Sequence, residues 1–311
     1  MGIITESRGS KHRMNAAVGS SQLMRAIMII LFAIFLFDVM GAIIKYLGNA
    51  YSSQQLAVMR NLFGIIPSLL VLWYTPAWHS AGRPLKIRQW KLGLFRGLLI
   101  TIAQFCFYLA LVSIEFATAT TIAFAGPMFV TALSIPILGL KVGIWRWLAV
   151  FIGFAGIVMV VQPGSDAFSW YALLPLGAAF GYGAASVTAR LFDDDVSTAL
   201  VNMYSILAAL FATTILAWST ASLAPVVSLH DWLWLLAMGM CGGTAVFCLI
   251  YAYRLVEPSL LSPFEYFGIP FSFFLGWVFF AEAPFERLFP GVLLIVAAGL
   301  LIVWREQKNQ G

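Results

Sequence analysis

Four ionisable residues lie inside long apolar stretches of this chain, where a charge needs a physical reason. Asp38 and Lys45 are seven residues apart in the first stretch, Arg60 is in the second, and Glu265 is near the C-terminal end. A charge at the centre of a bilayer costs on the order of 2.5–3.5 kcal/mol on insertion scales. Two acids and two bases sum to zero charge. We therefore expect these residues to bind a zwitterionic or polar solute, or one of the acids to take up a proton during a transport cycle.

Each of the four also has a purely structural interpretation. Lys45 is close to the end of its apolar stretch, so its ammonium group could reach the membrane surface. Arg60 could form a structural or gating ion pair, and Glu265 follows Pro263, where it could cap backbone groups freed by a kink. Asp38 lies deepest in its stretch, and we expect it to be the strongest candidate for solute contact.

Uncharged polar and aromatic residues recur at spacings of three, four or seven, which place side chains on one face of a helix. The alternative role for their hydroxyl and amide groups is hydrogen bonding between helices, worth about 1 kcal/mol each. As further lining of a solute cavity, the spacing predicts Gln104 with Tyr108, Tyr182 with Ser186, and Thr244 with Tyr251.

The composition requires a membrane to position these residues. Hydrophobic residues make up 61% of the 311 residues and charged residues only 10%, whereas soluble domains carry about 25% charged residues. A bilayer crossing needs about 20 apolar residues. The sequence therefore predicts an all-α polytopic membrane protein with ten helices, at 24–47, 54–74, 90–112, 116–138, 144–162, 168–190, 197–219, 231–252, 257–280 and 287–304.

The basic residues predict the orientation of these helices. Fifteen of the 18 lysines and arginines lie in the inner segments if the N-terminus is inside, among them Arg83, Lys86 and Arg96, whereas the outer segments hold only Arg287. Basic residues favour the cytoplasmic side of short loops. We therefore expect both termini in the cytoplasm. The excess of basic residues is then an orientation signal, and it gives no reason to expect nucleic acid as a partner.

The chain contains an internal repeat of five helices. A shift of 142 or 143 residues superposes polar, glycine and proline positions of the two halves, which gives units at 24–162 and 168–304. Because five is odd, the second unit must cross the bilayer in the opposite sense to the first. Inverted repeats around a central site are a recurring plan of secondary transporters. The matched positions include Glu115 with Glu257, Gly126 with Gly268, and Pro127 with Pro270.

Two aromatic residues occupy equivalent places beside the matched glycines. Phe124 in the 116–138 helix and Tyr266 in the 257–280 helix could form the floor of the cavity from both sides, and aromatic faces suit amphipathic or cationic solutes. Proline removes a helix hydrogen bond and favours a bend. We therefore expect Pro127 and Pro270 to act as hinges when the helices move during transport.

Several sequence segments resemble the EamA repeat of the drug/metabolite transporter superfamily over about residues 24–304. They include DVMGAIIKYL at 38–47, FAGPMFVTALSIPILG at 124–139 and GYGAASVTARL at 181–191. This resemblance implies a ten-helix inner-membrane carrier for amino acids, nucleotide-like metabolites or drugs, often an exporter. The chain departs from the family pattern at Gly139-Leu140, where Gly-Glu is usual after the fourth helix, although the second copy keeps Glu282. It also has Phe37-Asp38 where Trp-Gly is common.

Motifs of other function classes are missing from the sequence. It contains no P-loop, no HEXXH and no G-x-S-x-G motif, and no metal-ligand spacing. We therefore expect no enzyme activity, no cofactor and no metal. The expected partners are a small-molecule solute and the lipid bilayer, and a homodimer is compatible with this prediction.

Together, these patterns predict a multi-pass inner-membrane secondary transporter of the bacterial type. The first hypothesis is export of amino acids or similar small amphipathic metabolites by alternating access. The second is an uptake permease for a cofactor-like metabolite. A third, from a different class, is a membrane scaffold that transports nothing, which would have no use for buried charges.

Overall fold

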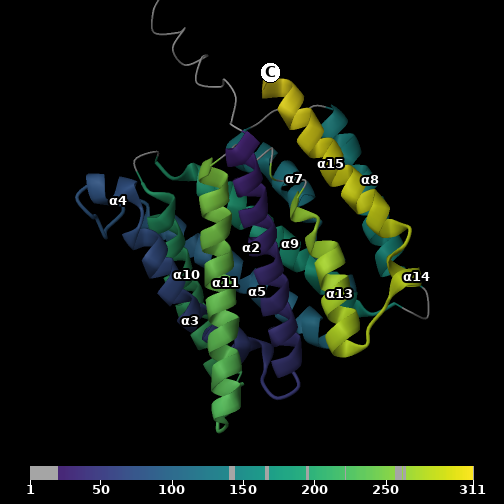
Figure 1. Cartoon of the computed structure of the whole chain (residues 1–311), viewed down its shortest axis with the longest axis horizontal. Helices are drawn as coiled ribbons and strands as arrows, with labels where there is room; N and C mark the ends of the chain where they lie inside the picture. Colours follow the sequence, from purple (N-terminus) through teal and green to yellow (C-terminus); the bar gives the residue numbers. More distant parts are fainter. Residues whose placement is uncertain are drawn as a thin grey trace, which may run out of the picture.

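The structure is a computed structural model that describes residues 20–139, 144–164, 168–193, 196–220, 222–255, 261 and 264–310. Its regular elements are helices (Figure 1). The longer helices are α2 (Ser20–Leu47), α3 (Ser53–Trp73), α5 (Trp90–Ser113), α6 (Phe116–Ala123), α7 (Gly126–Leu138), α8 (Ile144–Val161), α9 (Leu174–Thr188), α10 (Thr198–Ser219), α11 (Leu229–Leu255), α13 (Gly268–Phe280) and α15 (Gly291–Gln310). The short ones are α4 (Pro76–Ser80), α14 (Phe285–Leu288) and the 3-10 helices η1 (Trp170–Leu173) and η2 (Ala189–Leu191).

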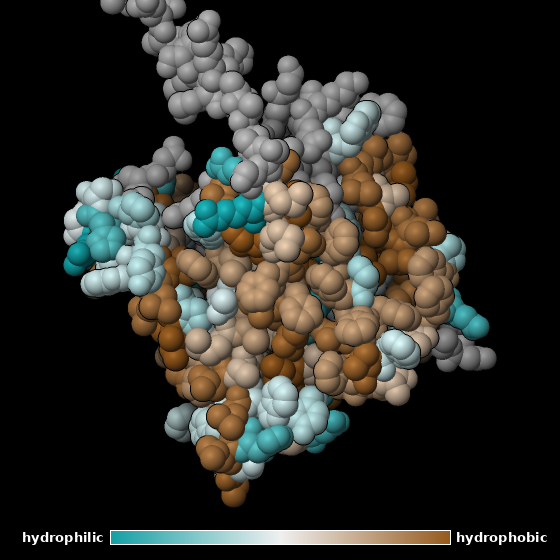
Figure 2. Space-filling model, viewed as in Figure 1, coloured by the Kyte–Doolittle hydropathy of each residue, from teal (hydrophilic) through white to brown (hydrophobic). Residues whose placement is uncertain are grey.

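The helices have the length and composition of membrane spans. Seven helical segments are long and apolar enough to cross a bilayer, and three shorter apolar helices cover Trp147–Val161, Gly268–Phe280 and Gly291–Leu301. Figure 2 shows hydrophobic residues across the middle of the visible face and hydrophilic residues mainly toward its ends. Large apolar side chains such as Phe211 and Trp277 are exposed on the surface of the bundle, where contact with lipid suits them better than contact with water. The prediction of an all-helical polytopic membrane protein is confirmed.

Helices far apart in the sequence pack side by side. In the first half, α2 packs on α11 and α13, and α3 packs on α11 and α10. In the second, α9 packs on α5 and α7, and α10 packs on α5 as well as α3. At the edge of the bundle, α8 and α15 lie against each other (Figure 1). There Gly156 and Gly291 let the two backbones touch, because a Cβ on either would meet the other's carbonyl oxygen at 2.6–2.7 Å.

Two spans are broken at equivalent places. Instead of one helix over 116–138, the chain forms α6 and α7 with a turn at Phe124 and Ala125. A turn at Tyr266 and Phe267 likewise precedes α13. Pro127 and Pro270 then fall in the first turn after the break, where a missing N–H leaves no hydrogen bond unmade. The bends lie within about a turn of where the prolines predict them, while the role of the two prolines as hinges stays a prediction.

Candidate functional site

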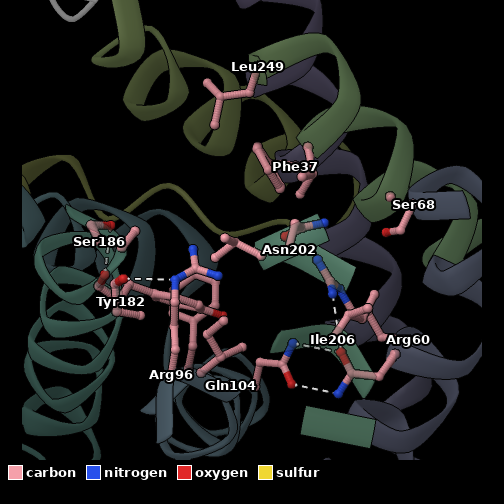
Figure 3. Close-up of a pocket in the computed structure, with 18 of the residues that line it drawn as sticks. Phe37, Arg60, Ser68, Arg96, Gln104, Tyr182, Ser186, Asn202, Ile206 and Leu249 are labelled. Carbon is pink, nitrogen blue, oxygen red and sulfur yellow. Dashed lines mark hydrogen bonds between the residues drawn. The ribbon is translucent and has the colours of Figure 1, made fainter. Parts of the chain in front are cut away.

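A cavity of about 880 Å³ lies between the two halves of the bundle. Its wall is built by α2, α3, α5, α6, α9, α10 and α11, together with the segment just before α13. Figure 3 shows side chains from these helices converging on it. Discontinuous helices at equivalent positions of two repeats often form binding sites in transporters. Here Phe124, at the break before α7, and Gly268, just after the second break, both line the cavity.

Eight of the twelve predicted lining residues face this cavity, and four lie elsewhere. Those in the lining are Asp38, Arg60, Gln104, Tyr108, Phe124, Tyr182, Ser186 and Glu265. Those placed outside the lining are Lys45, Thr244, Tyr251 and Tyr266.

Asp38 is a buried carboxylate on α2 with few compensating contacts. The residue is 7% exposed, and its Oδ2 atom has no hydrogen-bond partner. Among the described residues none forms an ion pair with it. A buried charge without a partner is expensive. This carboxylate is therefore suited to the cationic group of a solute or to a proton.

Arg60 and Gln104 meet at a polar cluster between α3 and α5. Asn61 and Gln104 exchange two hydrogen bonds of 2.9 and 3.0 Å, and both residues are fully buried. Arg60 donates from Nη1 to Asn61 Oδ1 at 3.2 Å, while its Nε is buried without a partner. The amide of Gln104 thus joins two helices, which is the structural role that we weighed for it. Arg60 forms no ion pair with any described residue.

The aromatic residues divide between the cavity and the core. Tyr108 lines the cavity with only 1% of its surface exposed. Phe124 faces the cavity, and its ring centroid lies 5.5 Å from that of Tyr266. Tyr266 itself turns away and packs against Gly299 and Val292 of α15. The predicted pair is therefore in contact, but only Phe124 faces the solute space.

The predicted polar residues of α9 line the cavity, whereas those of α11 lie outside its lining. Ser186 bonds its own helix, donating to Tyr182 O at 2.8 Å, and both residues line the cavity. On α11, Tyr251 accepts a hydrogen bond from Arg25 Nη2 at 3.2 Å, and that guanidinium also lies 5.8 Å from the ring centroid. Thr244 belongs to the same helix but not to the lining.

Lys45 takes part in a seal at one end of the bundle rather than in the cavity. Its Nζ lies 2.8 Å from Glu282 Oε1 and donates to Ile114 O at 2.6 Å. The other oxygen of Glu282, Oε2, accepts from the backbone N–H of Phe116 at 2.8 Å, at the first residue of α6. These contacts, which we call the Lys45–Glu282 seal, tie α2 to the chain that enters α6 and to the loop after α13.

Further hydrogen bonds close the same end. Gln55 exchanges two bonds of 2.7 and 2.9 Å with the backbone of Ala224. Tyr51, in the loop between α2 and α3, donates its hydroxyl to Asp231 Oδ2 at 2.7 Å, and this bond to a carboxylate raises the pKa of Tyr51. The opposite end is open, because Asp193 in the α9–α10 connection and Thr198 at the start of α10 are exposed and line the cavity.

Arg96 is a lining residue that sequence reasoning assigned to a different role. The positive-inside pattern predicts an orienting charge near the inner end of the 90–112 helix. In the structure Arg96 is inside α5 and faces the cavity. Its spacing was a usable signal, since Arg96, Ile100 and Gln104 recur every four residues and all three line the cavity. Within the described residues, no three His, Cys, Asp or Glu side chains form a possible metal site.

Comparison with known proteins agrees with the membrane fold. The sequence pattern of the EamA-like transporter family matches residues 24–162 and 169–304. The "S-adenosylmethionine uptake transporter" of Rickettsia prowazekii is 27% identical over 282 residues, covering 88% of this chain and 89% of the relative. The "Pseudopaline exporter CntI" of Pseudomonas aeruginosa is 26% identical over 273 residues, covering 88% and 93%. The "Riboflavin transporter" of Rhizobium johnstonii is 30% identical over 194 residues, covering 62% and 63%.

A solved protein crystal structure shares the fold, with a TM-score of 0.62 and 21% sequence identity over 93% of this chain and 99% of that chain. The family resemblance that the sequence motifs predicted is confirmed by the two matches, which together cover most of the chain. The chain therefore belongs to the EamA-like transporter family, carries two EamA domains within the drug/metabolite transporter superfamily, and is a secondary transporter of small metabolites rather than an enzyme.

Proposed function

We propose that this protein is an inner-membrane carrier that moves a zwitterionic, amino-acid-like metabolite by alternating access. The observation that carries the proposal is that an acid and two bases of the cavity lining have no ionic partner among the described residues. Asp38 lies on α2, while Arg60 and Arg96 lie on α3 and α5, and none of the three forms an ion pair with a described residue. A solute with one cationic and one anionic group can neutralise the acidic and the basic side chains of the cavity at the same time.

Alternating access is supported by the relation between the two halves. In the two repeats α2 corresponds to α9, α3 to α10, and α5 to α11. The α2–α11 contact therefore corresponds to the α9–α5 contact, and the α3–α11 contact to the α10–α5 contact. All four contacts occur. The helices α7 and α13 each have 13 residues, and both end at a left-handed residue, Gly139 with φ 67° and Ala281 with φ 54°. Two inverted five-helix repeats around the cavity, at 24–162 and 168–304, account for this correspondence.

The predicted orientation places the open end in the cytoplasm. The α9–α10 connection is an inner loop in the topology with both termini cytoplasmic, whereas the Lys45–Glu282 seal belongs to the outer ends. The structure then corresponds to an inward-open state of the carrier. In this state a solute enters from the cytoplasm, and the outer end must open for it to leave.

The cavity volume bears on the size of the solute. About 880 Å³ is near the upper end of the roughly 300–1,000 Å³ usual for pockets that hold drug-sized ligands. A free amino acid matches the charges but leaves most of that space to water. An amino acid joined to a larger planar group fills more of it, and Phe37, Phe107 and Phe124 in the lining suit such a group.

Two solute classes therefore remain as candidates. Export of free amino acids or similar small amphipathic metabolites follows from the charges and the family resemblance. Transport of a cofactor-like metabolite that carries an amino-acid group is favoured by the cavity volume and by the names of the relatives, which include S-adenosylmethionine uptake transporters and a pseudopaline exporter.

Flux measurements test both candidates. We would reconstitute the full chain in proteoliposomes and follow labelled S-adenosylmethionine and a set of labelled amino acids in both directions, with and without an imposed pH gradient. We expect saturable flux of at least one of these solutes, well above that of empty liposomes. Glu286→Gln serves as a control variant that should keep the wild-type flux, because Glu286 is an exposed acid on α14 outside the cavity. Flux no higher than in empty liposomes for every solute would contradict the proposal.

A further inference from the structure

Arg96 holds a fixed position in the cavity wall because it forms hydrogen bonds to two neighbouring helices. Its Nε donates to Ala185 O of α9 at 2.9 Å, and its Nη1 donates to Ser205 Oγ of α10 at 2.7 Å. Ser205 in turn donates to Val201 O at 2.8 Å, so its hydroxyl is oriented with a lone pair toward the guanidinium. The arginine is thus held by partners on both neighbouring helices before any solute arrives.

Two glycines bring those partners within reach. A Cβ at Gly97 would meet the Cβ of Ala208 and the carbonyl oxygen of Ser205, the latter at 2.8 Å. At Gly181 a Cβ would lie 2.9 Å from Ala103 Cβ and 3.0 Å from Leu99 O. The backbones of α10 and α9 therefore approach α5 closely on both sides of Arg96.

The remaining donors of Arg96 have no partner among the residues that the structure describes. A guanidinium carries five N–H donors, and two of them are used in the bonds to Ala185 and Ser205. Neither bond involves Nη2, and no carboxylate of the described chain forms an ion pair with this residue. Three donors and a full positive charge are therefore left for the cavity, where a fixed fork of donors suits a carboxylate.

Neighbouring side chains complete a place for an anionic group. Figure 3 shows Arg96 between Tyr182 of α9 and Asn202 of α10. Both residues line the cavity, and the Asn202 amide makes no side-chain hydrogen bond to a described residue. An amide N–H and a phenolic O–H can each donate to an anion beside the guanidinium.

Arg60, a second uncompensated guanidinium of the lining, is less suited to this task. Its Nη1 is bonded to Asn61 Oδ1, and its Nε is buried. A Cβ on Gly242 would lie 3.2 Å from Nε and 3.5 Å from Nη2, so α11 covers this side of the group. Arg60 therefore presents fewer accessible donors to the cavity than Arg96 does.

We propose that Arg96 anchors the carboxylate of the transported solute and selects for solutes that carry one. The proposal rests on the proposed function and deepens it by naming the anionic half of the binding site. Asp38, on another wall, is then left for the cationic group. Solutes that keep the cation and the planar group but lack the carboxylate bind less tightly, because three desolvated donors of Arg96 stay unsatisfied.

Two pairs of solutes test this directly, because the members of each pair differ in one carboxylate. They are S-adenosylmethionine against its decarboxylated amine, and L-phenylalanine against phenethylamine. Binding to the purified full-length protein and inhibition of flux are measured for all four. Charge-assisted hydrogen bonds of ordinary strength predict a wild-type preference for the carboxylate member of roughly 10- to 100-fold.

The variants separate solute contact from a structural role. Arg96→Gln should bring the preference close to one, largely by weakening the carboxylate member, while Arg96→Lys should keep part of it. Arg60→Gln, which alters another guanidinium of the cavity, should change the preference much less than Arg96→Gln does. Since Arg96 also joins α9 and α10, a merely structural defect would weaken both members of a pair equally and leave their ratio unchanged.

Several results would overturn the proposal. They are an unchanged ratio in Arg96→Gln, a ratio that collapses in Arg60→Gln instead, and a wild-type protein that binds both members of a pair equally. If none of the four solutes binds at all, the proposed function itself fails and takes this proposal with it. That outcome is distinct from binding without selectivity, which leaves the carrier proposal standing.

Discussion

Breaking the Lys45–Glu282 seal should open the end of the cavity opposite the α9–α10 loop. Glu282→Gln keeps the shape of the side chain but removes its charge. The side chains of Lys45 and Glu282 are only 11% and 22% exposed, so solvent replaces little of the lost interaction. Hydrogen bonds to charged groups contribute about 1.5–3 kcal/mol each. If the pair exists only while this end is closed, its loss shifts the ratio of open to closed forms by roughly 10- to 150-fold.

Cysteine accessibility measures this shift. In a chain whose three native cysteines are replaced by serine, Thr120→Cys puts a thiol in the cavity wall. A membrane-impermeant thiol reagent added outside intact cells can reach it only through the sealed end. We expect Glu282→Gln to raise the outside labelling rate about tenfold or more, and Lys45→Met to do the same. Because the two residues share one interaction, the double variant should add little to either single one.

The exposed acid Glu286 on α14 again supplies the matched control, and Glu286→Gln should leave labelling at the wild-type rate. Unchanged or slower labelling in both Glu282→Gln and Lys45→Met would refute the reasoning. The pair would then be a static link between helix ends rather than part of a gate.

Three further predictions concern the cavity, the core and the topology. Asp38→Asn, which removes the buried charge but keeps the shape, should lower flux at least tenfold in proteoliposomes without changing the yield of inserted protein, whereas a scaffold would be unaffected. Gly299→Ala should lower the unfolding temperature, because its Cβ collides with the Tyr266 hydroxyl and overpacking costs about 1–3 kcal/mol; an unchanged melting curve would contradict the packing. Cysteines at the exposed positions Ser80 and Ser228 should be labelled from opposite sides of the membrane, and labelling of both from one side would exclude the inverted topology.

Much of the helical fold follows from the length and composition of the apolar runs. The 90–112 and 197–219 predictions differ by a residue from α5 (Trp90–Ser113) and α10 (Thr198–Ser219). The break between α6 and α7 was not predicted as an interruption, because the run from 116 to 138 is apolar without a gap. Only the proline two residues after the turn indicated that the helix would bend there.

The pairing of the charges could not be deduced from helical spacing. Lys45 and Asp38 share a helix face by their spacing of seven, and this alone predicted a common cavity role. In the structure the partner of Lys45 is Glu282, in a loop 237 residues further along the chain, and no periodicity connects the two. Gln104 likewise pairs with Asn61 of another helix. Side-chain partners across helices depend on how the spans pack, which the apolar pattern leaves open.

The sequence of the first repeat holds no acid at the position that corresponds to Glu282. Because α7 and α13 have the same length and the same left-handed cap, Leu140 occupies the sequence position that corresponds to Glu282. The carboxylate that closes the outer end in our proposed topology thus has an apolar residue as its repeat counterpart. A carrier whose two gates were equivalent would populate both states equally when empty. Because the sequence has no acid at the repeat counterpart of Glu282, the Lys45–Glu282 seal should favour the closed outer end and an empty cavity that faces the cytoplasm, until a bound solute offsets the difference.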